Sequence, residues 1–240
     1  MDSNILITIC ARGGSKGIPK KNIFQVNGKP LIAYTIDFAT EFKKHVDCDI
    51  ILSTDDQMIK NVASDYGLET SYLRPSSLAN DDVGKVKTIE DALNFMEISN
   101  KIKYDFIVDL DVTSPLRTIK DLLNSIEILK KNKNAYNIFS VSDPNHNPYF
   151  DMVEKKENGC FNLVKSKGDY FSRQKSPEVY DMNASFYVFR RIFFEYEFNT
   201  QITNKSLIYR MNHLCFEIDN PIEMEFLDFL IKKNYTRNII

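Results

Sequence analysis

The sequence predicts an α/β fold with a mostly parallel sheet. Ile5–Cys10 is a continuous apolar and β-branched run, which is typical of a strand buried on both faces. Segments with helical periodicity then alternate with strand-like runs through the first half of the chain. With 43% apolar residues, 8 Gly and 8 Pro among 240 residues, the chain can bury one sizeable core. We therefore expect a single domain over residues 1–240 with a small insertion.

The alternation can be followed element by element. Pro30 precedes a helical pattern, and proline suits the first turn of a helix. Asp55 is a candidate cap for a second helix, which is expected to end at Gly67. The expected strands of this half are 5–10, 49–54, 70–73 and 104–110. The expected helices are 30–42, 55–66, 86–96 and 118–131.

The pattern changes after Asn137. Two alternating runs flank Asn158 and Gly159, which indicates a β-hairpin. We expect the chain to leave the main layer over about residues 145–180. The remaining expected elements are hairpin strands at 150–154 and 160–164, a strand at 184–189 and a closing helix at 221–233.

Charge and composition exclude several functional classes. The 31 basic and 33 acidic side chains nearly balance, so we expect neither nucleic acid nor a membrane as a partner. The apolar run near the start ends at Arg12, too early for a signal peptide or a membrane span, which predicts a cytoplasmic location. The cysteines are scattered without a C-x-x-C pair and are expected to be reduced and structural, and a structural role is also expected for the three histidines. These are Cys10, Cys48, Cys160 and Cys215, and His45, His146 and His213.

A glycine-rich basic loop follows the first strand. Gly13 and Gly14 would let the backbone approach a ligand, and four cationic side chains lie between Arg12 and Asn22. Ligands of α/β sheets bind beyond the carboxyl ends of the strands, so the loop is well placed for a polyphosphate. Its spacing matches neither the P-loop nor the dinucleotide fingerprint. A solvated Gly/Lys loop is the alternative on spacing alone.

The loop resembles the hallmark A-R-x-x-S-K-G-x-x-x-K-N of the acylneuraminate cytidylyltransferases, the synthetases of CMP-nonulosonic acids. The matching residues are Ala11, Arg12, Ser15, Lys16, Gly17, Lys21 and Asn22. Further family features follow in order: Ser53–Asp55, Arg74-Pro75, Leu78-Ala79, Asp81, Thr113–Arg117 and Asn183. The resemblance spans essentially the whole chain. It implies a three-layer, Rossmann-like nucleotidyltransferase fold with a small β-rich dimerisation insertion, a homodimer, and a place in surface polysaccharide biosynthesis.

The resemblance also implies an activity and a set of roles. The family transfers CMP from CTP to the anomeric hydroxyl of a nonulosonic acid and releases pyrophosphate. Lys21, Arg12 and Asp219 would be catalytic, and Arg74 would contact the base. The full set expected to bind CTP is Arg12, Gly13, Gly14, Ser15, Lys21, Asn22 and Arg74. Two alternatives stay open: a nucleotidyltransferase acting on another sugar or alcohol phosphate, and a non-catalytic protein that binds sugar nucleotides.

Acidic residues provide a candidate Mg²⁺ site. Glu217 and Asp219 alternate with Ile218, so on a short strand both carboxylates would share one face. Mg²⁺ prefers oxygen ligands and keeps substrate phosphates in its shell. Family members carry D-x-D here, from which Glu217 departs. Asp111 at a strand end is a candidate third ligand, because more distant Kdo-type synthetases bind metal from the equivalent position. The alternatives are solvated acids for the pair, and a turn or cap residue or the general base for Asp111.

Three residues are expected near the sugar. Arg173, in an R-Q segment that in relatives lies near the acidic sugar and sometimes reaches across a dimer, is a candidate partner of the sugar carboxylate. A solvated loop arginine is the alternative. Asp181 replaces a basic residue of the R-P-N-G segment of sialic-acid enzymes, while Asn183 matches it. Together with residues 147–150 and 109–117, this variation resembles bacterial synthetases for legionaminic acid more than those for N-acetylneuraminate.

Overall fold

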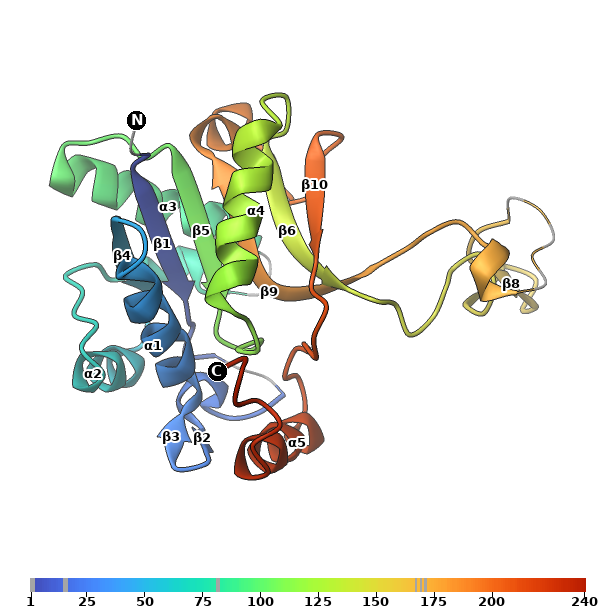
Figure 1. The fold of residues 1–240 in the computed structure, drawn as a ribbon, viewed down its shortest axis with the longest axis horizontal. Helices are drawn as coiled ribbons and strands as arrows, with labels where there is room; N and C mark the ends of the chain where they lie inside the picture. Colours follow the sequence, from blue (N-terminus) through green and yellow to red (C-terminus); the bar gives the residue numbers. More distant parts are fainter. Residues whose placement is uncertain (1–2, 15–16, 81–82, 167, 169, 171) are drawn as a thin grey trace.

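The computed structural model describes residues 3–14, 17–80, 83–166, 168, 170 and 172–240. Over these residues a six-stranded sheet with the order β10-β6-β9-β5-β1-β4 forms the centre of the molecule (Figure 1). Only β9 runs antiparallel to its neighbours, while the other pairings are parallel. The strands are β1 (Ile5–Cys10), β4 (Cys48–Ser53), β5 (Phe106–Asp111), β6 (Asn137–Ser142), β9 (Asp181–Arg190) and β10 (Ser206–Arg210). The predicted α/β class with a mostly parallel sheet is confirmed.

Helices cover both faces of this sheet and make three layers. Ile5, Ile7 and Ile9 of β1 pack with α1 and α4, whereas Leu6 packs with α3 on the other face. This alternation follows from the two-residue period of a strand. The helices are α1 (Leu31–Lys43), α2 (Gln57–Asp65), α3 (Lys85–Asn100), α4 (Ile119–Lys131) and α5 (Pro221–Lys232). The short strands β2 (Gln25–Val26) and β3 (Lys29–Pro30) form a separate pair before α1.

Several local expectations need correction. Residues 70–73 form no strand, because Tyr72 is buried against α3 and its hydroxyl contacts Asp91 there. The cap of α2 is Asp56 rather than Asp55, and its Oδ1 accepts hydrogen bonds from the N–H groups of Met58 and Ile59. The strands β6 and β10 have no counterpart among the expected elements, and α3 is longer than expected at both ends.

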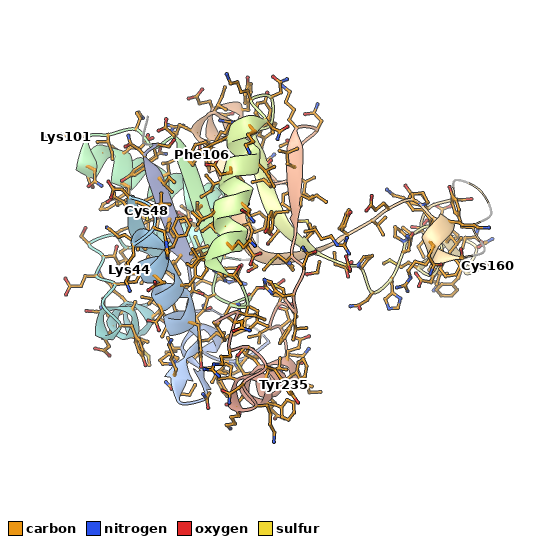
Figure 2. All side chains as sticks on the ribbon, in the orientation of Figure 1. Lys44, Cys48, Lys101, Phe106, Cys160 and Tyr235 are labelled. Atoms are coloured by element: carbon orange, nitrogen blue, oxygen red, sulfur yellow. The ribbon has the colours of Figure 1, made fainter. Side chains whose placement is uncertain are left out.

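The chain leaves the sheet after Ser142 and rejoins it at Asp181. We call residues 143–180 the arm. Its described residues project from the sheet, and Cys160 lies at the far end (Figure 2). Within the arm, β7 (Val153–Lys155) pairs antiparallel with β8 (Phe161–Leu163), as the hairpin prediction required. A positive φ of 82° at Gly159 closes the turn, a conformation that glycine adopts without strain. The single-domain organisation and the role of the arm in dimerisation stay predictions.

The cysteines and the membrane prediction can be compared with the structure directly. Cys10, Cys48, Cys160 and Cys215 are all free thiols. Among the described helices, none is long and apolar enough to cross a membrane.

Candidate active site

A cavity of about 310 Å³ opens at the carboxyl ends of β1 and β5. It brings the basic loop after β1 into contact with acidic residues from two distant parts of the chain. The residues that line it are Cys10, Arg12, Gly17, Lys21, Asn22, Asp111, Thr113, Glu217 and Asp219. Six of the residues predicted for the site therefore meet at one place: Arg12, Lys21, Asn22, Asp111, Glu217 and Asp219.

The glycine-rich loop is fixed against the end of β4. The Gly13 N–H donates to Asp55 Oδ1 at 3.0 Å, and a Cβ on Gly13 would lie 2.6 Å from Asp56 Oδ2. Asn22 is buried and donates from Nδ2 to the carbonyl oxygen of Arg12 at 2.9 Å. Gly13 and Asn22 thus fix the described parts of the loop, and the predicted contact of Gly13 with CTP stays a prediction. Gly14 is exposed, a Cβ on it would have no atom within 4 Å, and Ser15 lies outside the described residues.

The acidic segment 217–219 lies directly against this loop. Lys21 Nζ donates to the carbonyl oxygen of Ile218 at 2.8 Å and lies 3.2 Å from Asp219 Oδ1. A Cβ on Gly17 would lie only 2.7 Å from the carbonyl oxygen of Asp219, so this position has room for glycine alone. The segment is extended but is not a strand of the sheet, which corrects the expectation. The predicted alternation holds nevertheless, since Ile218 is fully buried while its two neighbours line the cavity.

Electrostatics distinguish Glu217 from its neighbours. Burial raises the pKa of Glu217, and the negative charges of Asp111 and Asp219 raise it further. A divalent cation held by Glu217 and Asp219 would relieve this repulsion, and carboxylate oxygens are the donors that Mg²⁺ prefers. Within the part of the chain that the structure describes, no group of three or more His, Cys, Asp or Glu side chains is arranged to hold a metal ion. An ion on Glu217 and Asp219 would take its remaining ligands from phosphate and water.

Asp111 is engaged inside the protein. Its Oδ2 pairs with the Lys85 ammonium at 2.5 Å, and its Oδ1 accepts hydrogen bonds from the N–H and the hydroxyl of Thr113 at 2.9 and 2.7 Å. Burial alone would raise the pKa of Asp111, but Lys85 and Thr113 outweigh it and lower the pKa to about 2. Such a carboxylate is a weak base, and both its oxygens are occupied. Asp111 thus holds the turn at Thr113, and its predicted role as a metal ligand stays a prediction.

Lys85 is a site residue that the sequence did not reveal. Its ammonium lies between Asp111 and Asp109, 3.1 Å from Asp109 Oδ2. Asp109 is fully buried, and its other oxygen accepts a hydrogen bond from the Thr8 hydroxyl at 2.8 Å. Burial lowers the pKa of Lys85, but the two aspartates raise it well above its ordinary value. The sequence around Lys85 contains no motif that predicts its ion pairs with Asp109 and Asp111.

Arg74 lies behind the cavity rather than in its lining. It is buried, and it donates from Nε to Ser53 Oγ at 3.0 Å and from Nη2 to the Ser53 carbonyl oxygen at 2.6 Å. These bonds fix Arg74 at the carboxyl end of β4. Its predicted contact with the base stays a prediction.

A second cavity of about 680 Å³ adjoins the first and shares Glu217 with it. Asp181 and Asn183 both line it, as expected for sugar contacts. Asp181 Oδ2 accepts a hydrogen bond from the Asn145 N–H at 3.1 Å. Arg210 and His213 also line this cavity and were not among the predicted site residues. We refer to it as the sugar cavity, after the predicted roles of Asp181 and Asn183.

The Asn183 amide holds the wall of this cavity together. Its oxygen accepts hydrogen bonds from the Ser140 hydroxyl at 2.6 Å and the Ser185 N–H at 3.2 Å. Its nitrogen donates to Ser142 Oγ at 2.8 Å and to Met211 Sδ at 3.3 Å. All four hydrogen-bonding positions of the amide are used. Asn183 therefore shapes the wall of the cavity, and its predicted contact with the sugar stays a prediction.

Arg173 lies in the arm and lines neither cavity. Its Nη2 pairs with Asp151 Oδ2 at 2.9 Å and donates to the Asn145 carbonyl oxygen at 2.8 Å. It borders a third cavity, of about 500 Å³, which shares Asp143 and Arg210 with the sugar cavity. Within one chain, Arg173 is thus not brought to the site that Lys21 and Asp219 form.

Two solved structures share the fold of this chain. CMP:2-keto-3-deoxy-manno-octonic acid synthetase complexed with CTP superimposes with a TM-score of 0.67 at 16% identity, covering 97% of this chain and 100% of that chain. The 4-diphosphocytidyl-2C-methyl-D-erythritol synthase from Anaerococcus prevotii gives a TM-score of 0.65 at 12% identity, covering 96% and 99%. At these identities the likeness establishes the fold alone, and this fold is the predicted three-layer, Rossmann-like arrangement.

Relatives found by sequence have higher identities to this chain, and they too match it over nearly its whole length. CMP-N,N'-diacetyllegionaminic acid synthase of Campylobacter jejuni is 40% identical over 232 residues, covering 95% of both chains. Post-translational flagellin modification protein B of Campylobacter coli is 37% identical over 234 residues, covering 96% of both. Pseudaminic acid cytidylyltransferase of C. jejuni is 29% identical over 232 residues, covering 96% of this chain and 97% of its own. The family model described as Cytidylyltransferase matches residues 6–238, and the chain belongs to the cytidylyltransferase family.

Proposed function

We propose that this protein transfers CMP from CTP to the anomeric hydroxyl of a nonulosonic acid and releases pyrophosphate. One observation carries the proposal: Lys21 of the glycine-rich loop meets Asp219 and Glu217 in a single cavity at the strand ends. A cation for phosphates beside carboxylates for a metal ion is the arrangement that nucleotidyl transfer needs. Membership of the cytidylyltransferase family and the relatives named for this reaction on nonulosonic acids support it.

The chemistry is an in-line displacement at the α-phosphorus of CTP. The anomeric oxygen forms a bond to this phosphorus, the bond to the bridging oxygen breaks, and pyrophosphate leaves while the hydroxyl proton is released. Arg12 and Lys21 would hold the phosphates and offset the charge that develops on them. Mg²⁺ on Glu217 and Asp219 would supply further charge neutralisation when bound. The low pKa of Asp111 argues against this carboxylate as the proton acceptor.

The proposed sugar is of the N,N'-diacetyllegionaminic acid type. The relative that makes the CMP derivative of this sugar is 40% identical to the chain, whereas the pseudaminic acid enzyme is 29% identical. Asp181, which departs from the sialic-acid pattern, lines the sugar cavity next to the site of transfer. We therefore assign Asp181 to the discrimination between sugars.

The test is pyrophosphate release from CTP with Mg²⁺, with N,N'-diacetyllegionaminate, pseudaminate, N-acetylneuraminate and Kdo offered separately to one enzyme preparation. The highest kcat/KM is expected for N,N'-diacetyllegionaminate. A preference for another nonulosonate would overturn the sugar assignment and leave the reaction standing. CTP binding without turnover on any of the four sugars would overturn the proposed reaction. Replacement of CTP by UTP, GTP or ATP should abolish turnover.

We further propose that the protein is a homodimer that uses the arm. The hairpin of the arm exposes Met152, Val153 and Phe161, which suits burial against a second copy. Such a dimer would also give Arg173 a route to the sugar cavity of the partner. Light scattering should give a dimer mass for the wild type and a monomer mass for Phe161→Asp. A dimer mass in the variant would exclude the arm as the contact. The cytoplasmic location stays a prediction.

A further inference from the structure

The segment that joins β10 to α5, residues 211–220, leads past the sugar cavity (Figure 1). Its backbone is held near each end. The N–H of Met211 donates to a carbonyl oxygen of β6 at 2.9 Å, and the N–H of Ile218 donates to the carbonyl oxygen of Thr113 at 2.8 Å. Between these bonds, residues 212–217 make no main-chain hydrogen bond to another backbone group of the described chain. Side chains must therefore fix this stretch.

His213 attaches the stretch to α4. Its Nε2 lies 2.9 Å from Asp121 Oδ2 in the first turn of that helix, and its Nδ1 lies 3.0 Å from the carbonyl oxygen of Leu214. The pair is shielded from water, since the side chains of His213 and Asp121 are only 21% and 9% exposed. A second attachment joins Cys215 Sγ to Ser114 Oγ at 3.4 Å, and it is weaker because thiols are poor hydrogen-bonding groups.

Both contacts of the His213 ring require a donor. A carboxylate and a carbonyl oxygen can only accept, whereas a neutral imidazole has one N–H and one lone pair. The imidazolium form alone satisfies both oxygens. The hydrogen bond to Asp121 raises the pKa of His213, burial opposes the shift, and the Leu214 carbonyl oxygen adds to the rise. Loss of the proton turns a lone pair toward one of the two oxygens, so the ring or the Leu214 peptide must move.

The same side chain belongs to the lining of the sugar cavity. The two basic side chains of the lining are Arg210 and His213, and Arg210 is paired with Asp143 at 2.6 Å. A nonulosonic acid would add its own carboxylate to this surface. Protonated His213 therefore also lowers the negative potential that such an acceptor meets. The acidic side chains of the lining are Asp143, Asp181, Glu217 and Glu223.

We propose that His213, as an imidazolium, is a positioning residue for the acceptor sugar. It holds residues 212–217 against α4 and so keeps the wall of the sugar cavity in the shape that binds a nonulosonic acid. This inference rests on the proposed function and extends it. The triphosphate side is held separately, because Lys21 Nζ donates to the Ile218 carbonyl oxygen at 2.8 Å. The effect of His213 should therefore fall on the sugar and not on CTP.

The groups packed around His213 keep one charge state between about pH 6 and about pH 8.5. Burial alone would raise the pKa of Asp121, but hydrogen bonds from His213 and Thr118 outweigh it and lower the pKa. Tyr209 of β10 donates its hydroxyl to Asp121 Oδ1 at 3.2 Å, and burial raises the pKa of Tyr209. Burial also raises the pKa of Cys215. Asp121 thus stays ionised while Tyr209 and Cys215 stay neutral, and His213 is the member of this group that titrates.

The test measures pyrophosphate release at saturating CTP and Mg²⁺, and takes the KM for N,N'-diacetyllegionaminate, or for whichever of the four sugars gives the highest kcat/KM. At about pH 6, His213→Gln should raise this KM about three- to tenfold, since part of the free energy of one charged hydrogen bond reaches the sugar. The difference from wild type should shrink toward about pH 8.5, where wild-type His213 loses its proton. The KM for CTP should not change. His45→Gln alters an exposed histidine that faces Glu41, and should leave both KM values unchanged.

His213→Lys provides a rescue, because its ammonium can donate to both oxygens and keeps its charge. The KM for the sugar should then stay low at about pH 6 and no longer rise toward about pH 8.5. A loss of stability alone would lower the active fraction, and thus kcat, without separating the two KM values. The same pH dependence in wild type and His213→Gln, or an equal rise of both KM values, would overturn the inference and leave the reaction standing. Absence of pyrophosphate release with all four sugars would overturn the proposed function and this inference with it.

Discussion

Lys21 Nζ lies 3.2 Å from Asp219 Oδ1, and this ion pair joins residues that are 198 positions apart in the chain. Lys21 is mostly buried, whereas the Asp219 side chain is largely exposed. The pair places a group that suits phosphate next to a group that suits a cation. In the proposed reaction this single contact would serve both the phosphates of CTP and a Mg²⁺ ion bound with them.

Lys21→Ala should lower kcat/KM for CTP by about 10²-fold or more, because it removes one preorganised charge from the phosphates. Pyrophosphate release measures the loss, and circular dichroism checks that the fold is retained. Lys20→Asn is the matched control. It removes the neighbouring charge, and asparagine tolerates the positive φ of 55° found at this position. Equal losses in the two variants would remove Lys21 from its catalytic role.

Gly17→Ala should cost about 10²-fold in kcat/KM, a loss that small displacements of catalytic groups can cause. The added Cβ would lie 2.7 Å from the Asp219 carbonyl oxygen, so the acidic segment must shift. Gly14→Ala adds the same methyl group where no atom lies within 4 Å, and its loss should be smaller. Steady-state kinetics of both variants give the two losses in kcat/KM. A larger loss for Gly14→Ala than for Gly17→Ala would contradict the close approach of Gly17 to the Asp219 carbonyl oxygen.

Glu217→Gln should stabilise the metal-free protein while it lowers activity. Burial and the charges of Asp111 and Asp219 disfavour ionised Glu217, and glutamine removes that charge. We expect the unfolding temperature to rise by about 2 °C in chelator-treated buffer, and Mg²⁺-dependent pyrophosphate release to fall by about 10²-fold. Glu225→Gln, on the exposed side of α5, should change neither quantity. A lower unfolding temperature for Glu217→Gln would show that repulsion does not dominate at this carboxylate.

Lys85→Met should destabilise the protein by about 3 kcal/mol, since it leaves two aspartates near the core without their cation. Asp109 is fully buried, so water cannot replace the lost ammonium there. Urea denaturation gives the change in free energy of unfolding. Lys87→Met changes an exposed lysine of the same helix that pairs with Glu90, and should cost under about 1 kcal/mol. Similar costs for the two variants would mean that the buried pair contributes little.

His213 predicts a pH dependence of stability. A hydrogen bond to Asp121 raises the pKa of His213 above its ordinary value of 6.5, although burial opposes the shift. The stabilisation is therefore complete below pH 6.5 and is lost as the pH rises through the higher folded-state pKa. His213→Gln should lower the unfolding temperature at about pH 6 and have less effect at about pH 9. His45→Gln serves as the surface control, and a His213→Gln effect that grows with pH would contradict the assigned sign.

Much of the fold was predictable, because the sequence patterns that indicate its strands, helices and turns lie within short segments of the chain. The apolar run of β1 and the glycines after it identify a buried strand followed by a ligand loop, whatever lies around them. The strands β6 and β10 were missed, because pairing between distant segments creates them and β10 is only half-buried. At residues 70–73, by contrast, the sequence predicted a strand that does not form. The segment has strand-like composition, yet the Tyr72 side chain is buried against α3 without a partner strand.

In the candidate site, too, residues with a local sequence signal were predicted, and residues that depend on a tertiary partner were not. Glu217 and Asp219 were found because their alternation with Ile218 survives in an extended segment, even though no sheet forms there. Lys85 and Arg210 were not found, since each acquires its role only through a tertiary partner, Asp111 for the first and Asp143 for the second. Asn183 was placed correctly at the cavity, but the sequence could not show that its amide is fully used by neighbours.

The arm has a consequence for how such enzymes diversify. Its described residues are mostly exposed, and its hairpin strands pair only with each other, so substitutions along it impose little penalty on the folded core. Its two ends, however, join β6 and β9 beside the sugar cavity. Mutation in the arm can therefore alter the border of that cavity while the cavity lined by Lys21 and Asp219 keeps its structure.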